Sequence, residues 1–170
     1  MADRTDLEHK SAAPTHVGCY VITVSDTRTE ATDTGGRAIV HLLSAAGHEI
    51  VGHTIVKDDA ELLRDAIGRQ LANPAVQAII TTGGTGIASR DSTYEAVTAM
   101  LWKRLDGFGE LFRMLSYHQI GAAAMMSRAV AGTVAGRVVI ALPGSEAAVR
   151  LAVEKLVVPE LGHLVREAGR

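Results

Sequence analysis

A strand that runs directly into a glycine-rich loop, and then into a helix, most constrains the fold of this chain. Residues 76–82 are apolar and rich in β-branched side chains, and residues 83–86 read Gly-Gly-Thr-Gly. The apolar residues that recur at helical spacing after the loop are Tyr94, Val97, Met100 and Leu101. This order predicts a buried strand, a tight loop and an amphipathic helix, the repeating connection of α/β proteins.

The glycine loop has the composition of an anion-binding loop. Glycine allows positive φ angles and has no Cβ to keep a ligand away, so several backbone N–H groups can turn toward one phosphate. The N-terminus of the following helix also favours an anion. A Walker loop is excluded because no Gly-Lys-Ser/Thr end follows, and a dinucleotide fingerprint lacks its third glycine, since Ala88 and Ser89 stand in that region. A tight turn with no ligand is the alternative.

Strand and helix patterns alternate along the rest of the chain. Strand-like runs lie at residues 17–24, 49–56, 129–134 and 137–141, and the last two are separated by Ala-Gly, which indicates a hairpin. The apolar faces of the expected helices are Ile39, Leu42, Leu43 and Ala46; Leu63, Ala66, Ile67 and Leu71; Leu111, Met114, Leu115 and His118; and Ala148, Leu151, Ala152 and Leu156. We predict an α/β fold of three layers: a mostly parallel sheet, helices on both faces, and a C-terminal hairpin.

The domain organisation follows from length and composition. With 170 residues, 47% of them hydrophobic, the chain suits one domain with a sizeable core. Residues 1–16 are polar and without periodicity, so we expect a flexible N-terminal tail followed by a single domain over residues 17–170.

Pro159 is expected to set off a final helical turn. We also expect Trp102, Met125 and Met126 to serve packing, and His118 to lie in the core or at an interface.

Charge and cysteine usage restrict the cellular setting and the partners. The formal net charge of −2 gives no basic footprint for a nucleic acid or an acidic membrane surface. Cys19 is the single cysteine, so no internal disulfide is possible and a reducing cytoplasm is expected. No apolar stretch reaches transmembrane length, and the N-terminus does not read as a signal peptide. We therefore expect a cytoplasmic protein.

The loops after parallel strands are expected to share one edge of the sheet. Ser25, Lys57, Thr82 and Leu142 each stand at or directly after the end of an expected strand. In an open α/β sheet, ligands bind beyond the carboxyl ends of the strands. The convergence of four polar loops therefore predicts a binding crevice at this edge.

Two aspartates are the acidic candidates at this edge. Asp58 follows the second strand and Asp91 follows the glycine loop, so both carboxylates could hold Mg²⁺ beside a bound phosphate. Helix capping is the alternative explanation, with either Asp58 or Asp59 as the cap of the next helix. Ser92 and Glu95 also have the spacing of a capping box.

Other polar residues of these loops have two readings as well. Ser25 and Asp33 lie in the long first loop, and Ser145 starts the last main helix. They could contact a phosphate or the edges of a ring, but residues of these types also form ordinary turns and N-caps. Capping is the favoured reading of Ser145. Arg90 could pair with a phosphate, although a solvated arginine is the commoner case.

Several separated motifs resemble one protein family. The loop resembles the Thr-Gly-Gly-Thr-Gly mark, followed by Asp-x-Thr-Pro-Glu-Ala, of the molybdenum cofactor biosynthesis family that includes MogA, MoaB and the G domain of plant and animal molybdopterin-inserting proteins. The resemblance continues at residues 23–26, 33–34, 107–110, 112–113, 127–129 and 142–145, and residues 107–121 look most like the MoaB branch. Tyr94 stands where the family commonly has proline, which is expected to cost local rigidity.

The resemblance implies a molybdopterin-binding fold and an adenylyltransferase. In this reaction molybdopterin is adenylylated with Mg-ATP and pyrophosphate is released, before metal insertion. Asp58 and Asp91 match the aspartates of catalytically competent relatives, which gives them a catalytic and metal-holding role. The residues implied to bind substrate are Ser25, Asp33, Thr82, Gly83, Gly84, Thr85, Gly86 and Ser145.

The resemblance also leaves functional alternatives and implies partners. A non-catalytic pterin-binding or carrier protein of the same pathway is the main alternative, and a nucleotide-dependent oxidoreductase is a weaker one. Relatives assemble as trimers or hexamers, so a homotrimer or homohexamer is expected, with other cofactor-synthesis proteins as further partners. The segment over residues 107–126 could supply the contact surface, and burial within the monomer is an equally good account.

Overall fold

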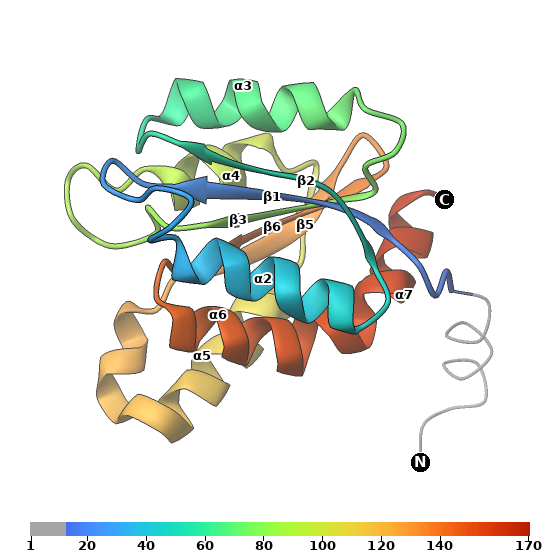
Figure 1. Ribbon diagram of the computed structural model, residues 1–170. Helices are drawn as coiled ribbons and strands as arrows, with labels where there is room; N and C mark the ends of the chain where they lie inside the picture. Colours follow the sequence, from blue (N-terminus) through green and yellow to red (C-terminus); the bar gives the residue numbers. More distant parts are fainter. Residues whose placement is uncertain (1–12) are drawn as a thin grey trace, which may run out of the picture.

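The computed structural model describes residues 13–170, so most of the expected N-terminal tail lies outside the described residues. Six strands and six α-helices alternate along this part of the chain (Figure 1). The strands are β1 Gly18–Val24, β2 Glu49–Val56, β3 Ala78–Thr82, β4 Lys103–Arg104, β5 Val130–Val134 and β6 Arg137–Leu142. The helices are α2 Thr34–Ala45, α3 Ala60–Leu71, α4 Thr93–Met100, α5 Asp106–Ile120, α6 Glu146–Ala152 and α7 Val158–Ala168, with a 3₁₀ helix, η1, at Gly121–Met126 and a π-helical segment, η2, at Val153–Val157.

The strands form one sheet in the order β2-β1-β3-β6-β5-β4. Strands β2, β1, β3 and β6 are parallel, and their carboxyl ends are level because Val24 pairs with Val56, and Thr82 pairs with both Thr23 and Leu142. Strands β5 and β6 are antiparallel and meet at a two-residue turn, which confirms the hairpin. The loops after four strands therefore leave the sheet at one edge, as the sequence predicts.

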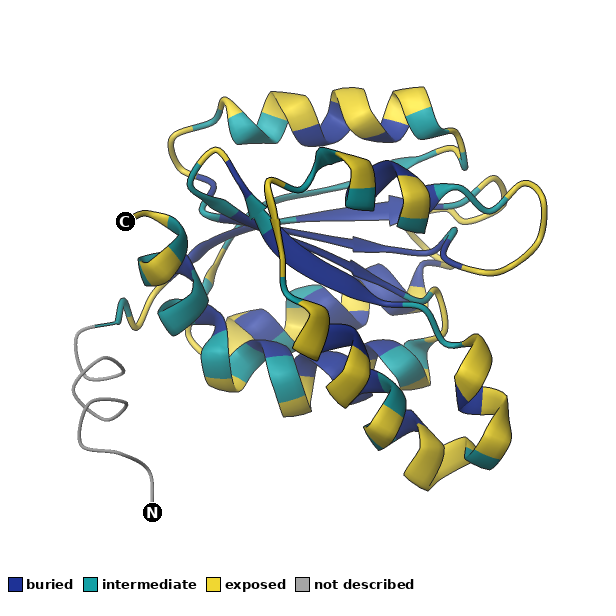
Figure 2. Cartoon of the chain, turned by 180° about the vertical axis from the view of Figure 1, so that it is seen from behind, coloured by how far each residue is buried: buried dark blue, intermediate teal, exposed yellow. Residues whose placement is uncertain are grey.

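Helices cover both faces of the sheet and make three layers. Side chains of α3 and α4 pack on one face, and side chains of α2, α5, α6 and α7 pack on the other. Figure 2 shows the central strands as almost entirely buried, between helices that are exposed only on their outer sides. The predicted fold class is confirmed. No helix of residues 13–170 has the length and apolarity needed to cross a membrane.

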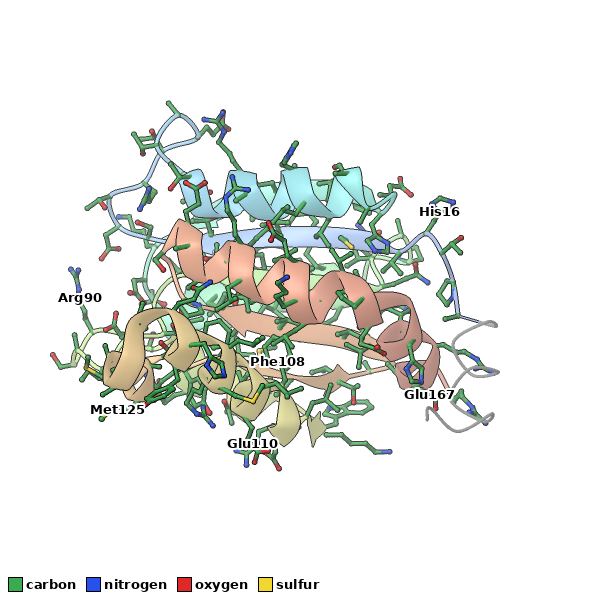
Figure 3. All side chains as sticks on the ribbon, turned by 90° about the horizontal axis from the view of Figure 1, so that it is seen from below. His16, Arg90, Phe108, Glu110, Met125 and Glu167 are labelled. Carbon is green, nitrogen blue, oxygen red and sulfur yellow. The ribbon has the colours of Figure 1, made fainter. Side chains whose placement is uncertain are left out.

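The buried face of α5 differs from the prediction. The structure buries Phe108, Gly109, Phe112 and Ser116, whereas Met114 is 50% exposed and His118 is exposed. Figure 3 shows Phe108 pointing into the molecule and Glu110 pointing away from it. The helix begins at Asp106, so both phenylalanines lie on its first two turns, and burying these large rings removes more apolar area from water than burying Leu111 and Met114.

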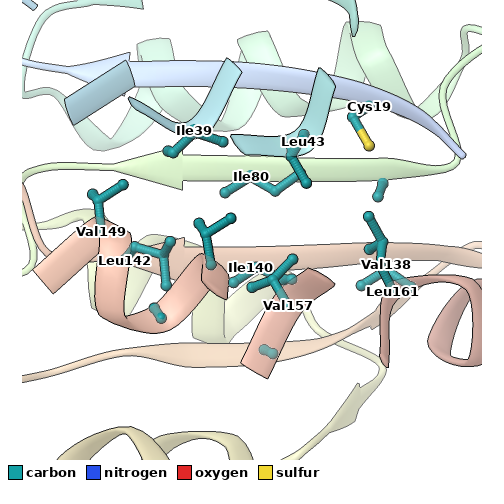
Figure 4. Packing of buried hydrophobic residues seen from close by; sticks show 14 of the residues in the cluster. Cys19, Ile39, Leu43, Ile80, Val138, Ile140, Leu142, Val149, Val157 and Leu161 are labelled. Carbon is teal, nitrogen blue, oxygen red and sulfur yellow. The ribbon is translucent and has the colours of Figure 1, made fainter. Parts of the chain in front are cut away.

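Alternation along the strands divides the interior into two cores. On β1, Cys19 and Val21 face α2 and α6, whereas Ile22 and Val24 face α3 and α4. The same period of two runs through β3 and β6. Figure 4 shows the first of these cores, where Ile80 and Ile140 of the sheet meet side chains of α2, α6 and η2. Burial raises the pKa of the Cys19 thiol to about 12, as expected for an inert packed side chain.

Two smaller expectations are wrong. Pro159 does not set off a separate turn, because η2 leads without a break into α7. A proline lacks an N–H, and the wider π-helical segment directly before it lets the helix continue. Trp102 is 74% exposed and Met125 is 77% exposed, so neither serves packing within the described chain. Pro14, which belongs to the expected N-terminal tail, lies against α7. A methyl group added at Gly162 of this helix would come within 2.2 Å of the Pro14 carbonyl oxygen.

The revised face of α5 can be tested by truncation. Phe112→Ala removes a fully buried ring and should lower the free energy of unfolding by roughly 3–5 kcal/mol. Gln119→Ala, at an exposed position of the same helix, should change it by less than about 0.5 kcal/mol. Urea denaturation of the two variants measures both values, and equal effects would contradict the assignment.

Candidate functional site

The glycine loop begins where three strands end together. The N–H of Gly83 donates to the Leu142 carbonyl oxygen at 3.1 Å, which ties the loop to β6. On the other side, a methyl group added at Gly83 would lie 2.2 Å from the carbonyl oxygen of Val24 on β1. Gly83 also has a φ of 98°, so only glycine fits this position.

The carbonyls of the next three residues are all turned toward the protein. Gly84 O accepts from Thr93 N at 2.9 Å, and Arg128 donates to Thr85 O at 2.8 Å and to Gly86 O at 2.5 Å. In a trans peptide the C=O and the following N–H point in opposite directions. The N–H groups of Thr85, Gly86 and Ile87 therefore face away from these partners, and no acceptor within residues 13–170 takes them. Adjacent free N–H groups of this kind suit a phosphate.

Asp58 lies directly beside this loop. A methyl group added at Gly84 would come within 2.9 Å of Asp58 Oδ1 and within 2.3 Å of Thr93 Oγ1. Both of these oxygens are buried and have no hydrogen-bond partner among the described residues. Buried polar atoms are nearly always paired in proteins, so two such oxygens around one glycine indicate a site for a ligand, an ion or water.

Asp91 closes the other end of the loop. Its Oδ2 accepts from Ala88 N at 2.9 Å, and a methyl group added at Gly86 would lie 2.4 Å from the same oxygen. Asp58 and Asp91 therefore flank residues 84–86 from two elements, as the sequence predicts. Arg90 extends outward at this end of the molecule and is exposed (Figure 3).

The surroundings of Asp58 favour a cation. Burial is the main cause that raises the pKa of this carboxyl, and the carboxylates of Asp91 and Asp26 raise it further; Arg90 and the Ser92 N–H oppose them only in part. No group of three or more His, Cys, Asp or Glu side chains within residues 13–170 is arranged so that it could hold a metal ion by itself. The carboxylates of Asp58 and Asp91, together with the unpaired Oγ1 of Thr93, still suit Mg²⁺. This ion keeps several waters and commonly takes its other ligands from substrate phosphates.

A second group of the predicted residues lines a small cavity on the other side of Gly83. The cavity measures about 160 Å³, and its lining residues are Thr23, Val24, Ser25, Arg28, Asp33, Thr82, Gly83 and Gly144. Ser25 Oγ accepts from the N–H groups of Thr27 and Arg28, and Thr82 Oγ1 donates to Pro143 O at 2.8 Å. The hydroxyl proton of Ser25 remains available to a ligand.

Asp33 and Ser145 have structural roles. Asp33 is buried and caps α2: its Oδ1 accepts from Gly36 N, and its Oδ2 accepts from Thr23 Oγ1 at 2.5 Å and lies 3.0 Å from His53 Nε2. Ser145 caps α6 by accepting from Ala148 N. The capping reading is confirmed for both, and a direct contact of either side chain with a pterin stays a prediction.

For the helix caps, the structure decides between two stated alternatives at α3 and corrects the expected capping box at α4. Asp59, and not Asp58, caps α3, with Oδ1 accepting from two backbone N–H groups. Ser92 stands at the N-cap of α4 but makes no side-chain cap hydrogen bond, and Glu95 pairs with Arg128, so no capping box forms. Local spacing suggested the box, but an arginine 33 residues away competes for the same carboxylate.

The structure adds residues that sequence reasoning did not assign to the site. Thr93 and Gly144 lie close in sequence to the predicted residues Asp91 and Ser145. This position was the only sequence signal that could have identified them. Arg28 belongs to the first polar loop, and its Nη1 donates to Thr32 O at 2.5 Å. Arg128 lies inside a motif that resembles the family, but no local pattern connects it with a loop 42 residues earlier.

The raised pKa of Asp58 predicts how pH affects stability. The folded protein keeps this proton at pH values where the unfolded chain, with an ordinary pKa of 3.8, has lost it. The ionised carboxylate therefore costs folding free energy above its folded-state pKa, and the cost vanishes below about pH 3.8, where both states are protonated. In metal-free protein at pH 7, Asp58→Asn should raise Tm, and the difference should shrink as the pH is lowered.

Thermal melts across pH measure this effect, with Asp59→Asn as the matched control. Asparagine keeps the cap of α3, so the control should melt close to wild type at every pH. A lower Tm for Asp58→Asn at pH 7 would show that the carboxylate is stabilised by its surroundings, contrary to our description.

Comparisons with known proteins agree with this geometry. Residues 20–163 match the family model described as "Probable molybdopterin binding domain". Molybdenum cofactor biosynthesis protein B of Bacillus cereus is 51% identical over 164 residues, which cover 96% of this chain and 97% of that protein. A crystal structure of a molybdenum cofactor biosynthesis protein B superposes with a TM-score of 0.89 at 50% identity, covering 92% of this chain and 98% of the other.

A more distant solved structure extends the comparison. The tungsten cofactor synthesizing protein MoaB from Pyrococcus furiosus superposes with a TM-score of 0.79 at 36% identity, covering 93% of this chain and all of that one. The match of the family model, the level of identity and the near-complete coverage lead to one conclusion: the chain belongs to the molybdenum cofactor biosynthesis family of MoaB and MogA, with a molybdopterin-binding fold.

Proposed function

We propose that this protein binds molybdopterin and adenylylates it with Mg-ATP. An oxygen of the terminal phosphate of molybdopterin attacks the α-phosphorus of ATP and forms a new P–O bond. The bond between the α-phosphorus and the oxygen that bridges to the β-phosphorus breaks, and pyrophosphate leaves. The observation that carries the proposal is the glycine loop: the N–H groups of Thr85, Gly86 and Ile87 have no acceptor among the described residues, Asp58 lies beside Gly84, and Asp91 lies beside Gly86.

Chemistry of this kind asks a protein mainly to position charged groups and to stabilise the charge that develops on them. The N–H groups of Thr85, Gly86 and Ile87 are fixed before any ligand arrives, because the neighbouring carbonyls are already bonded to protein. Fixed donors need little reorganisation when charge develops on a phosphate oxygen. The loop is therefore suited to hold a phosphate of the substrate during transfer.

Asp58 and Asp91 would hold Mg²⁺ at the edge of this loop. When bound there, Mg²⁺ would neutralise charge on the phosphates and help to orient them. Asp58 supplies a buried oxygen that has no partner among the described residues, and the neighbouring carboxylates that raise its pKa would be offset by a cation. Asp91 is held in place by the Ala88 N–H, so one of its oxygens is oriented in advance.

The cavity beside Gly83 is suited to the polar edge of a pterin. Its lining offers the Ser25 hydroxyl, backbone atoms of Gly83 and Gly144, and the nearby Arg28 guanidinium. About 160 Å³ is too small for a whole molybdopterin, so we propose that the cavity takes part of the ligand while the phosphate extends along the loop. The resemblance to family members and the matching family model support this choice of ligand.

We also propose that the protein acts as a homo-oligomer, through α5 and η1. This segment exposes six large apolar side chains: Leu111, Met114, Tyr117, Ile120, Met125 and Met126. Arg113, Met114, Tyr117, Ala122, Ala124 and Met125 line an apolar groove on it of about 360 Å³. In Figure 2 the same segment forms an exposed projection from the body of the molecule. Apolar surface concentrated in this way is typical of a contact between subunits, and the family resemblance points to a second copy.

The adenylylation proposal predicts the behaviour of the two aspartates. Purified protein with molybdopterin, ATP and Mg²⁺ should release pyrophosphate. Asp58→Asn and Asp91→Asn should each lower the rate at least about a hundredfold, because removing one charge-stabilising group from a transfer site typically costs that much. Molybdopterin binding should stay near wild type. Asp59→Asn should leave the rate unchanged, because it replaces a neighbouring carboxylate that only caps α3.

Two results would contradict the adenylylation proposal. Full turnover in Asp91→Asn would exclude its metal role. Tight molybdopterin binding with no pyrophosphate release by wild type would make the protein a pterin carrier, and neither aspartate would then have a catalytic role.

The oligomer proposal predicts the mass of the protein in solution. Met114→Glu places a charge in the exposed apolar surface and should convert a trimer or hexamer to monomers, as measured by light scattering after gel filtration. Leu62→Glu is the matched control, since Leu62 is 47% exposed on α3, which covers the opposite face of the sheet. A monomeric wild type, or an unchanged mass for Met114→Glu, would refute the proposed contact.

A further inference from the structure

Arg128 joins the glycine loop to the start of α4. Its Nε donates to Thr85 O at 2.8 Å, and its Nη2 donates to Gly86 O at 2.5 Å and to Glu95 Oε2 at 3.3 Å. Its Nη1 pairs with the other oxygen of Glu95. The guanidinium also lies over the ring of Tyr94, 4.7 Å from the ring centroid. One side chain therefore contacts two loop carbonyls, one carboxylate and one aromatic ring.

The geometry of these contacts decides which way the loop N–H groups face. A guanidinium is flat and presents its donors in a rigid fork, so Arg128 holds two successive carbonyls on the same side of the loop. The peptide units are trans, so the N–H groups of Gly86 and Ile87 must then point to the opposite side. These are two of the three free N–H groups that form the proposed phosphate site.

Arg128 has little capacity left to bind a substrate itself. A guanidinium has five N–H donors, and the contacts above use four of them on the protein. The side chain is 25% exposed, and the Glu95 carboxylate balances its charge. Hydrogen bonding to Arg128 is the main cause that lowers the pKa of Glu95, so the carboxylate stays ionised and keeps the guanidinium in place.

The start of α4 depends on the same side chain. Ser92 makes no side-chain hydrogen bond at the N-cap, so the usual local support for a helix start is missing. The residues that follow, Tyr94 and Glu95, both contact Arg128, and Thr93 N donates to Gly84 O. The cation–π contact with Tyr94 supplies rigidity where no proline fixes the first turn of the helix.

We propose that Arg128 is the positioning residue of the phosphate loop. It holds the carbonyls of Thr85 and Gly86 against α4, so that the adjacent N–H groups stay directed at the terminal phosphate of molybdopterin. This inference rests on the proposed function in one respect, namely that the loop binds this phosphate. It does not require that adenylyl transfer follows.

The test compares Arg128→Met and Arg128→Lys with wild type, using Arg150→Met as a control. Arg150 forms an exposed ion pair with Glu146 and makes no contact with the loop. Three quantities are measured: the Kd of molybdopterin without ATP, the melting temperature, and the exchange rate of the Thr93 amide hydrogen by NMR. The Thr93 amide is bonded to Gly84 O, so its exchange reports on the loop without any ligand.

Arg128→Met should weaken molybdopterin binding at least about tenfold and speed exchange of the Thr93 amide by a similar factor. Arg128→Lys should melt close to wild type, since an ammonium can still pair with Glu95, but it should not restore binding, because it cannot donate to both carbonyls in one plane. Arg150→Met should change neither binding nor exchange. If Arg128 had only a structural role, molybdopterin binding would weaken only to the extent that the melting temperature falls.

Wild-type binding in Arg128→Met, or full restoration of binding by Arg128→Lys, would overturn the inference. Failure of the proposed function is distinguishable from this result. If wild type binds molybdopterin but releases no pyrophosphate, the tenfold difference in Kd should persist. If wild type does not bind molybdopterin, the proposed function fails, and unchanged exchange of the Thr93 amide in Arg128→Met would overturn the positioning role as well.

Discussion

The site depends on the close passage of Gly83 over the ends of the central strands. Its N–H bonds to the last residue of β6, and its Cα lies so near the Val24 carbonyl of β1 that no side chain fits between them. The level ends of the parallel strands put Thr23, Thr82 and Leu142 side by side, which makes this passage possible. From this one contact the chain turns outward, and the next three residues pass between two acidic side chains.

Hydrogen bonds from elements that are distant in sequence hold the loop in its shape. Thr93 of α4 bonds the first carbonyl, and Arg128 bonds the next two. Because the carbonyls are occupied, the N–H groups are free, and they are fixed before a ligand binds. Asp58, by contrast, lowers the stability of the fold, because burial and two nearby carboxylates disfavour its ionised form. Sites that trade stability for function in this way are common, and a bound cation would offset the cost.

Much of the architecture could be predicted, because it rests on local patterns. The continuous apolar, β-branched run at residues 76–82 predicted a buried strand, and Ala135-Gly136 predicted the hairpin. The positions of Asp58 and Asp91 after two parallel strands predicted their approach to the loop. Each of these inferences uses neighbours in sequence or the shared edge of a parallel sheet.

The remaining features could not be predicted, because they depend on contacts between distant segments. Glu95 had the spacing of a capping box, but its partner is Arg128, beyond the whole of α5. The buried face of α5 was misjudged because Phe108 and Phe112 dominate its packing, which leaves an apolar outer face that periodicity alone reads as core. Asp33 looked like a loop residue open to ligand, and only the structure shows Thr23 and His53 against its carboxylate.

The central claim is that the loop and the two aspartates transfer an adenylyl group to molybdopterin. Following the label of α-phosphorus-labelled ATP, with Mg²⁺ and molybdopterin present, tests it most directly. Our account predicts that the label moves into a pterin product as pyrophosphate appears. Label that remains in ATP, or that appears only in free AMP, would contradict it.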